Sequence, residues 1–292
     1  MASLMLGDIR LDRVVEDEQA SVLPSEWFPD ATAEALAPMM GWLVPKVICP
    51  TTGRMIVPYQ TYVVRTRHHT ILIDTCYGND KTLPSDPAWN KRTGGRYLAD
   101  LAALGVDPAS VDFVLCSHLH LDHCGWNTRL VNGRWVPTFP NARYLLSKRE
   151  VEHAEAIAAQ EPDQVFAESV APILESGQAL LVPMDHALDD AVRLEPTPGH
   201  TPGHVAIRLA SGSASAVMCG DLMHSPIQCA KPEWCPSFDW DLPMARATRR
   251  SFLEACAASR DLVMTAHFPS PSIGWIDRAG DAFRFRFIDA DV

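Results

Sequence analysis

Short apolar runs, each followed by a turn or a polar cluster, recur along most of this chain. Residues 70–74 and 111–117 have the β-branched and apolar content of buried strands, whereas residues 95–104 are typical of a helix that ends before Gly105 and Pro108. Further strands are predicted at 55–67, 142–146, 180–182, 191–195, 205–209, 215–219, 261–265 and 283–288. Further helices are predicted at 148–160, 163–175 and 243–258. Strands with interspersed helices predict an α/β fold of two or four layers.

The chain shows no linker and no internal repeat, so residues 1–292 are predicted to form a single domain. Ser147 and Glu150 match a capping box, which predicts that their side chains bond the free amides at the start of a helix. Residues 1–45 differ, because they hold aromatic residues among prolines and acids. Two interpretations of this N-terminal extension stay open: a lid over a pocket or a dimer contact, or a segment simply packed on the core.

Charge excludes some partners. The chain has 36 acidic and 25 basic residues, a formal net charge of −11, which repels phosphate backbones and anionic membranes. We therefore expect neither nucleic-acid nor membrane binding, and no apolar run approaches the roughly 20 residues that span a bilayer. The N-terminus has no basic residue before its short apolar stretch, unlike a secretory signal, so a cytoplasmic location with eight reduced cysteines is expected. A homodimer is expected only from the general frequency of two-fold symmetry.

The strongest chemical signal is an HxHxDH cluster that directly follows the predicted strand 111–117. It contains His118, His120, Asp122 and His123. Imidazole and carboxylate groups are good ligands for zinc and neighbouring metals, and the end of a strand is where the sites of α/β folds usually lie. Three clustered histidines argue against a merely solvated polar turn.

Three more candidate ligands follow the same logic. His200, Asp221 and His267 each come shortly after a short apolar strand. A catalytic zinc takes three protein ligands and a water, so seven candidates fit two ions that share one carboxylate. Two divalent ions are therefore predicted as cofactors; zinc is favoured, and manganese, iron or cobalt would also suit these ligands.

These motifs, HxHxDH, then GHTPGH, then GD and a histidine after a strand, resemble the metallo-β-lactamase fold superfamily over residues 55–270. The resemblance implies a four-layer αββα sandwich with the site at one edge, between two sheets. It implies a first metal held by His118, His120 and His200, a second held by Asp122, His123 and His267, and Asp221 as the bridge. It also places Asp74 behind the metals, where it would orient a ligand; a strand-end cap is the alternative for this residue.

Within the superfamily the spacing is most similar to the N-acyl-homoserine lactonase and organophosphorus (methyl parathion) hydrolase branch. This resemblance implies a dinuclear metal-dependent hydrolase in which a metal-bridging hydroxide opens a lactone or cleaves an ester. A phosphotriester or phosphodiester hydrolase on the same site is the alternative. Lactonases of this type usually carry Tyr three residues after the bridging Asp, and here that position is His224. Asp122 or His224 is expected to help protonate the leaving group; otherwise His224 is a pocket-wall residue.

The substrate pocket is less readable from sequence. Trp126 follows the HxHxDH cluster and Phe268 follows His267, so either would line an apolar pocket for a small-molecule substrate, or belong to the core. His204 is expected to be a core or supporting histidine rather than a ligand.

Overall fold

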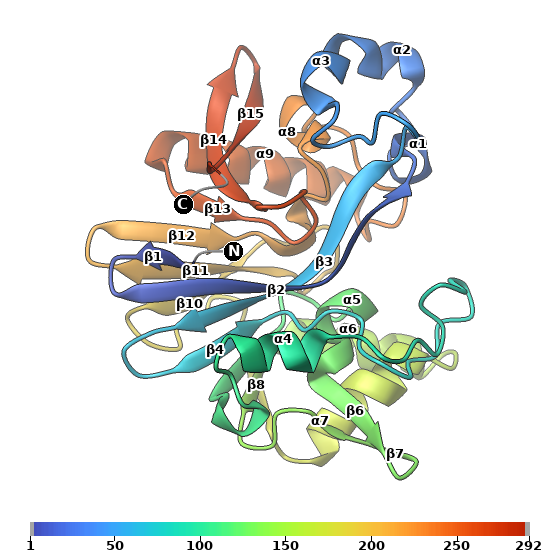
Figure 1. The fold of residues 1–292 in the computed structure, drawn as a ribbon, viewed down its shortest axis with the longest axis vertical. Helices are drawn as coiled ribbons and strands as arrows, with labels where there is room; N and C mark the ends of the chain where they lie inside the picture. The colour runs from blue at the N-terminus through green and yellow to red at the C-terminus, as the bar shows by residue number, and fades with distance from the viewer. Residues whose placement is uncertain (1–2, 290–292) are drawn as a thin grey trace.

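Two β-sheets packed face to face form the centre of the computed structural model, which describes residues 3–289 (Figure 1). The first sheet has seven strands in the order β1-β2-β3-β4-β5-β8-β9. Their bounds are β1 Leu4–Leu6, β2 Ile9–Val22, β3 Met55–Arg65, β4 Thr70–Ile73, β5 Phe113–Leu115, β8 Arg143–Ser147 and β9 Ala179–Val182. Strands β4, β5, β8 and β9 run parallel, so their carboxyl ends reach the same edge of the sheet.

The second sheet has six strands in sequence order, with one parallel pair, β12 and β13. Their bounds are β10 Val192–Pro196, β11 Val205–Ser211, β12 Ala214–Met218, β13 Leu262–Met264, β14 Ile273–Ala279 and β15 Ala282–Phe287. A separate hairpin is formed by β6 (Thr128–Val131) and β7 (Arg134–Pro137).

Helices cover the outer faces of both sheets (Figure 1). Those on the side of the first sheet are α4 Tyr97–Ala103, α6 Lys148–Ala158 and α7 Ala171–Glu175, and α7 is preceded by a π-helical turn, Phe166–Val170. The longest helix, α9 (Leu242–Ser259), covers the second sheet. The short helices α1 Pro24–Trp27, α2 Ala33–Leu36, α3 Met40–Leu43 and α8 Ile227–Ala230 surround one end of β3. The architecture is the predicted four-layer αββα sandwich.

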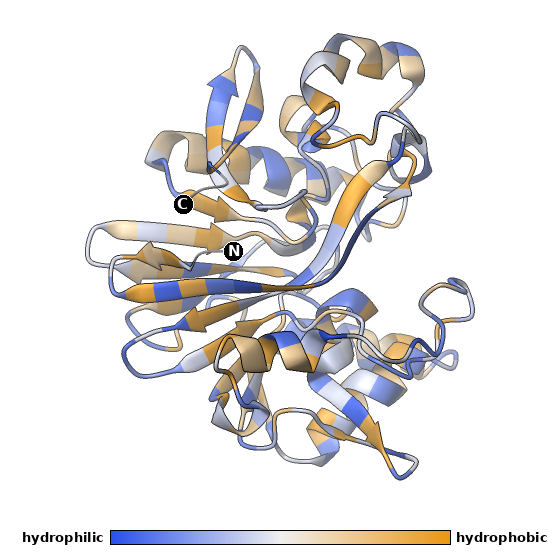
Figure 2. Ribbon diagram, viewed as in Figure 1, coloured by the Kyte–Doolittle hydropathy of each residue, from blue (hydrophilic) through white to orange (hydrophobic). Residues whose placement is uncertain are grey.

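Strand alternation explains the layers. On β4, Ile71 and Ile73 enter the core between the sheets, whereas Leu72 between them faces the helices. Because successive strand side chains point to opposite faces, a strand covered on both sides must be apolar at every position. Figure 2 shows such hydrophobic bands on the central strands. The two cores hold the strand ends, and therefore the residues that follow them, in fixed positions.

Strand β2 is the largest element that the sequence pattern did not predict. Its 14 residues carry several acids, which hide the strand alternation. Its charges are paired in the fold: the buried Asp12 carboxylate contacts the guanidinium groups of Arg10 and Arg65. The segment predicted as an N-terminal extension is therefore partly a component of the first sheet, paired along β3.

The predicted capping box is wrong in its bonding. Helix α6 does begin after Ser147, but the Ser147 hydroxyl makes no hydrogen bond within residues 3–289. The Glu150 carboxylate instead turns inward and bonds other segments, as described below. All eight cysteines lie in the described part of the chain and are free thiols. Within that same part, no helix has the length and apolar character needed to cross a bilayer.

Candidate metal centre and adjoining cavity

All seven candidate ligands lie in segments that follow strands, at one edge of the sandwich. His118 and His120 come after β5, and the next turn, α5 (Leu121–Cys124), carries Asp122 and His123. His200 lies in the loop between β10 and β11, and His267 follows β13. Asp221 lies in η5 (Gly220–Leu222), a 3-10 turn after β12. Both sheets therefore contribute side chains to a single centre.

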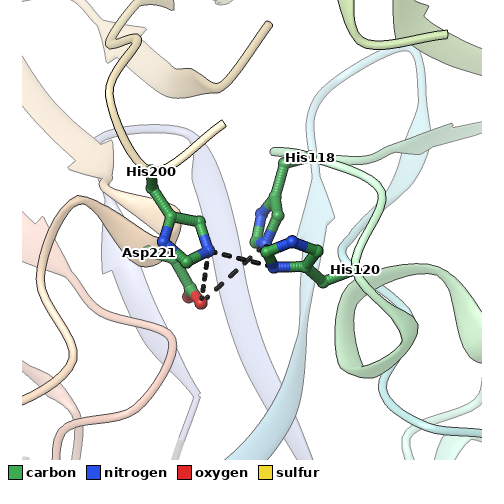
Figure 3. A group of neighbouring side chains, drawn as sticks. All are labelled: His118, His120, His200 and Asp221. Atoms are coloured by element: carbon green, nitrogen blue, oxygen red, sulfur yellow. Dashed lines mark hydrogen bonds and ion pairs between the residues drawn. The ribbon is translucent and has the colours of Figure 1, made fainter. Parts of the chain in front are cut away.

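The first set consists of His118, His120, His200 and Asp221, whose donor atoms lie within 4.8 Å of one another. Nδ1 of His120 lies 3.0 Å from Nε2 of His118 and 3.0 Å from Nε2 of His200. Oδ2 of Asp221 lies 3.5 Å from Nε2 of His200 and 3.8 Å from that of His118. Figure 3 shows the three rings and the carboxylate directed toward one another.

The second set consists of Asp122, His123, His267 and again Asp221. The other carboxylate oxygen of Asp221, Oδ1, lies 3.0 Å from Nε2 of His267 and 3.2 Å from Nε2 of His123. Oδ2 of Asp122 lies 3.4 Å from both of these nitrogens. Asp221 thus presents one oxygen to each set, which is the arrangement expected of a bridging carboxylate.

These separations match the space around a metal ion. Ligand bonds of 2.0–2.1 Å in tetrahedral geometry place neighbouring donors about 3.3 Å apart, and the observed separations are 3.0–3.8 Å. Oδ1 of Asp221 is also buried without a hydrogen bond in the described structure, which is costly for a carboxylate oxygen unless a cation balances it. The residues present therefore fit two divalent ions.

The ring nitrogens that face away from the centre are held by partners. Nδ1 of His123 lies 2.8 Å from the Asp74 carboxylate, and Nδ1 of His267 lies 3.0 Å from the Pro58 carbonyl oxygen. Nδ1 of His200 lies 2.8 Å from the Asp239 carboxylate. Such partners take the Nδ1 proton and leave Nε2 free for a metal. Asp74 also accepts hydrogen bonds from the backbone and hydroxyl of Ser117, so it does more than cap a strand.

The pKa shifts of the ligands differ. Against the effect of burial, Asp221 and Asp122 raise the pKa of His123 well above its usual value and also raise that of His267, so a bound cation would displace protons from these two rings. Burial lowers the pKa of His118 well below its usual value and keeps the ring neutral. Burial opposes ionisation of Asp221, but His123 and His267 beside it hold the pKa of this carboxyl well below its usual range. A neutral imidazole and an ionised carboxylate are the forms that bind cations.

Close backbone contacts hold the ligand loops together. Glu150 accepts hydrogen bonds from the Leu119 amide at 3.3 Å, the Gly203 amide at 2.9 Å and the Thr201 hydroxyl at 2.8 Å. One buried carboxylate therefore joins the loop between His118 and His120 to the loop after His200. Nε2 of His204 accepts a hydrogen bond from the Asp221 amide, which agrees with its predicted supporting role.

A cavity of about 640 Å³ opens onto the metal ligands. Its walls are aromatic, and its lining includes His120, Asp122, Asp221, His224 and His267 at the inner end. The aromatic lining residues are Trp27, Tyr59, Tyr77, Trp89 and Phe238. Since Trp27 belongs to α1, the N-terminal segment forms part of the wall. Residues of the N-terminal segment therefore contribute to the cavity wall as well as to the first sheet.

Neither predicted pocket residue lines this cavity. Trp126 is buried beneath the ligand loop, where it stacks on Tyr97 and donates to the Glu16 carboxylate. Phe268 is fully buried against Phe285 in the core outside the second sheet. Adjacency to a ligand in sequence failed as a guide because both side chains enter core clusters instead of the cavity. The wall residue Tyr77, three residues after Asp74, was not identified from sequence.

His224 lies at the inner end of the cavity and is buried. Its Nε2 is 3.1 Å from Oδ2 of Asp221, yet neither ring nitrogen makes a hydrogen bond within the described residues. Burial lowers the pKa of His224, so the ring is neutral and carries one N–H. Its edge faces Trp27 and Phe238, with ring centroids 5.6 and 5.3 Å away. The ring therefore has unused hydrogen-bonding capacity beside the metal ligands.

A model of the metallo-β-lactamase superfamily matches residues 56–255, more than half of the chain. The chain belongs to this superfamily. As a member of the metallo-β-lactamase superfamily it is similar to N-acyl homoserine lactonase from Bacillus sp, with 26% identity over 179 residues that cover 58% of this chain and 65% of that protein. N-acyl homoserine lactonase AttM from Azorhizobium caulinodans is 47% identical over 57 residues, which are 20% of this chain and 18% of that protein. The matches thus span less than two thirds of each relative.

Solved structures of this superfamily share the fold over almost the whole chain. The hydrolase AbOPH of the β-lactamase superfamily superposes with a TM-score of 0.81 at 22% identity, covering 98% of both chains. AidC, a dizinc quorum-quenching lactonase solved with the product N-hexanoyl-L-homoserine, superposes with a TM-score of 0.77 at 21% identity, covering 99% of this chain and 98% of that one. At these identities the likeness establishes the fold.

Proposed function

We propose that this protein is a metal-dependent hydrolase that opens a neutral lactone or cleaves a neutral ester. The observation that carries the proposal is the pair of ligand sets that share Asp221 at the inner end of an aromatic cavity. Two divalent ions bound there would supply an activated water and a Lewis acid for the substrate oxygen. The names of the lactonase relatives and of the dizinc structural neighbour agree with this reaction class.

The cavity favours an uncharged substrate. Apart from the metal-ligand candidates Asp122 and Asp221, its lining contains one carboxylate, Asp86, and one arginine, Arg54. The Arg54 guanidinium is already engaged, because it lies 3.2 Å from the Glu26 carboxylate and donates to the Ser21 carbonyl. An anionic phosphodiester would meet little compensating charge from these side chains. A neutral phosphotriester would fit the same aromatic walls and remains the second candidate.

Side chains of the cavity could bind the substrate and supply the proton that the leaving group needs. The aromatic walls would hold the apolar part of the substrate and exclude water. His224 would donate its N–H to a substrate oxygen, because neither ring nitrogen makes a hydrogen bond among residues 3–289, although Nε2 lies 3.1 Å from Oδ2 of Asp221. Asp122, whose side chain is more exposed than those of the other ligands that flank Asp221, would share the leaving-group proton with His224.

A proton-release assay on zinc-loaded protein tests this proposal. The panel holds acyl-homoserine lactones, simple γ- and δ-lactones, aryl esters and a phosphotriester. Each hydrolysis frees one acid, and we expect turnover of a lactone or an ester that Asp122→Asn abolishes. Turnover of the triester alone would select the second candidate. If two ions are bound per chain and none of these compounds is hydrolysed, the proposed substrate class is wrong.

Substitution of His224 distinguishes a role in the reaction from a role only in the pocket wall. If the ring donates a hydrogen bond to the reacting substrate, His224→Ala lowers kcat by roughly 100-fold, the scale of a lost general acid or a lost donor to the reacting oxygen. His224→Gln, which retains a donor, recovers part of the rate. A pocket-wall role would instead change KM and leave kcat near that of the wild type.

The predictions of one domain, a cytoplasmic location and a homodimer are retained as proposals. The dimer is checked by light scattering on the purified chain, where a mass near twice 32.2 kDa is expected.

A further inference from the structure

Arg249 occupies a core position on α9, where helical spacing calls for an apolar residue. The other buried positions of this helix are Ala245, Phe252, Leu253 and Cys256. Arg249 is 1% exposed, although arginine is almost never fully buried unless its charge is paired. An arginine on an otherwise apolar helix face therefore needs polar partners for its guanidinium within the protein.

The contacts of Arg249 lead to the metal centre. Its guanidinium donates to the carbonyl oxygens of Leu222 at 2.9 Å, Pro232 at 2.9 Å and Trp234 at 3.0 Å. Leu222 directly follows Asp221, the shared ligand. The remaining nitrogen, NH2, lies 3.4 Å from Oδ2 of Asp239. One side chain therefore joins the segment that carries Asp221 to the loop that carries Asp239.

Asp239 continues this connection to a ligand of the first set. Its side chain is fully buried, and its second oxygen, Oδ1, lies 2.8 Å from Nδ1 of His200. The backbone of the same loop is tied to the His200 loop, since the Trp240 amide donates to the His200 carbonyl and the Asp241 amide donates to that of Gly199. The orientation of the His200 ring is thus set almost entirely by this loop.

We infer that Asp239 and Arg249 are positioning residues for the first ion: Asp239 orients His200, and Arg249 fixes Asp239 while it holds the backbone beside Asp221. The inference rests on the metal centre proposed above, but not on the reaction. The buried Asp239 carboxylate needs a compensating charge, and Arg249 supplies it. The second set has a separate support, because His123 is held by Asp74. The two ions should therefore respond to different substitutions.

Zinc titration without substrate tests this inference. Competition with a chromophoric chelator resolves two binding steps in the wild type, and His200→Ala and His267→Ala assign each step to its set. We expect Asp239→Asn to weaken the first-set step by about 10–100-fold and to leave the other unchanged, as is typical for the loss of a partner behind a ligand. Asp74→Asn is the mirror control and should weaken the second-set step more than the first, which Asp74 reaches only indirectly through Ser117 beside His118.

Arg249→Lys supplies a second, independent variant, with Arg250→Lys as its matched control. Arg250 is the neighbouring residue on α9, and its side chain is half exposed beside Glu254. Lysine keeps the charge but cannot hold four acceptors in one plane, so Arg249→Lys should weaken the first-set step several-fold while Arg250→Lys changes neither step. The double variant Asp239→Asn/Arg249→Lys should weaken the first-set step by less than the product of the two single effects, because part of the action of Arg249 passes through Asp239.

The inference would be overturned if a folded Asp239→Asn variant bound zinc equally more weakly in both steps, or as tightly as the wild type in both. If this variant does not fold, the same outcomes are applied to Arg249→Lys. A wild type that binds two ions but hydrolyses nothing in the panel would overturn only the proposed function. A wild type that binds fewer than two ions would overturn the metal centre, and this inference with it.

Discussion

Replacement of Glu150 by alanine should destabilise the protein although this residue is not a metal ligand. The carboxylate is 3% exposed and accepts hydrogen bonds from the amides of Leu119 and Gly203 and from the Thr201 hydroxyl. Alanine leaves two backbone N–H groups buried without an acceptor, at about 1–3 kcal/mol each. The hydroxyl can turn elsewhere, and removal of a buried charge returns part of the loss. We therefore expect a loss of about 3 kcal/mol of unfolding free energy.

Urea unfolding of chelator-treated protein measures this loss, because bound zinc would otherwise add its own binding energy to the folded state. A change of about 3 kcal/mol corresponds to a drop in Tm of roughly 5–10 °C in a domain of this size. Glu152→Ala is the matched control, since Glu152 lies on the same helix but is exposed and meets Lys148 only at 3.7 Å. It should change stability by no more than about 0.5 kcal/mol. Equal stabilities of the two alanine variants would refute the role assigned to Glu150.

The effect of Glu150→Ala on stability should also depend on pH. Burial raises the pKa of Glu150, even though its hydrogen bonds to Thr201, Leu119 and Gly203 oppose the rise. The folded state therefore binds a proton that the unfolded state has already released, and the wild type loses stability as pH rises from the unfolded pKa of about 4.5 through the folded value. The alanine variant lacks this contribution. The stability difference between wild type and variant should narrow as pH rises over that window, and a difference that widens would contradict the argument.

Three further predictions concern packing, substrate and metal. Gly125→Ala should abolish soluble folded protein, because its Cβ would lie 1.8 Å from the Tyr77 carbonyl oxygen, whereas Gly41→Ala, with no atom within 4 Å, should leave the yield and circular dichroism spectrum unchanged. Trp27→Ala should lower kcat/KM for an aryl ester about tenfold, with zinc content unaltered, if the aromatic wall binds the substrate. Asp221→Ala should reduce bound zinc from two ions to less than one per chain by atomic absorption, and retention of both would exclude a bridging role.

The candidate ligands could be singled out from sequence because they follow predicted strands, whereas their division into two sets came from the resemblance to the metallo-β-lactamase superfamily. Apolar runs marked the strands, and the polar residues that follow parallel strands meet at one sheet edge. His118 and Asp221 come from different sheets, yet each was identified by the same local pattern. The four layers followed from the resemblance, and the element order was consistent with them.

The cavity could not be predicted in this way. Its aromatic walls come from α1, β3 and two loops, and the sequence shows no pattern that ties Trp27 to Phe238, although their rings lie 6.0 Å apart. Strand β2 was missed because its acids are bonded by residues that lie far away in sequence: Asp12 pairs with Arg65, and Glu18 accepts a hydrogen bond from the Ser270 amide. In each case the deciding interaction is a tertiary contact, which local propensity does not encode.

The division of the metal ligands between the two sheets also has a consequence for synthesis on the ribosome. The seven-stranded sheet is complete once Val182 has emerged, but His267 is made 85 residues later. At translation rates of roughly 5–20 residues per second, this interval lasts about 4–17 s. During that time the nascent chain presents an uncovered apolar sheet face and a half-assembled set of histidines. Chaperone capture and zinc supply in that interval, rather than the stability of the finished fold, would then limit the yield of active protein.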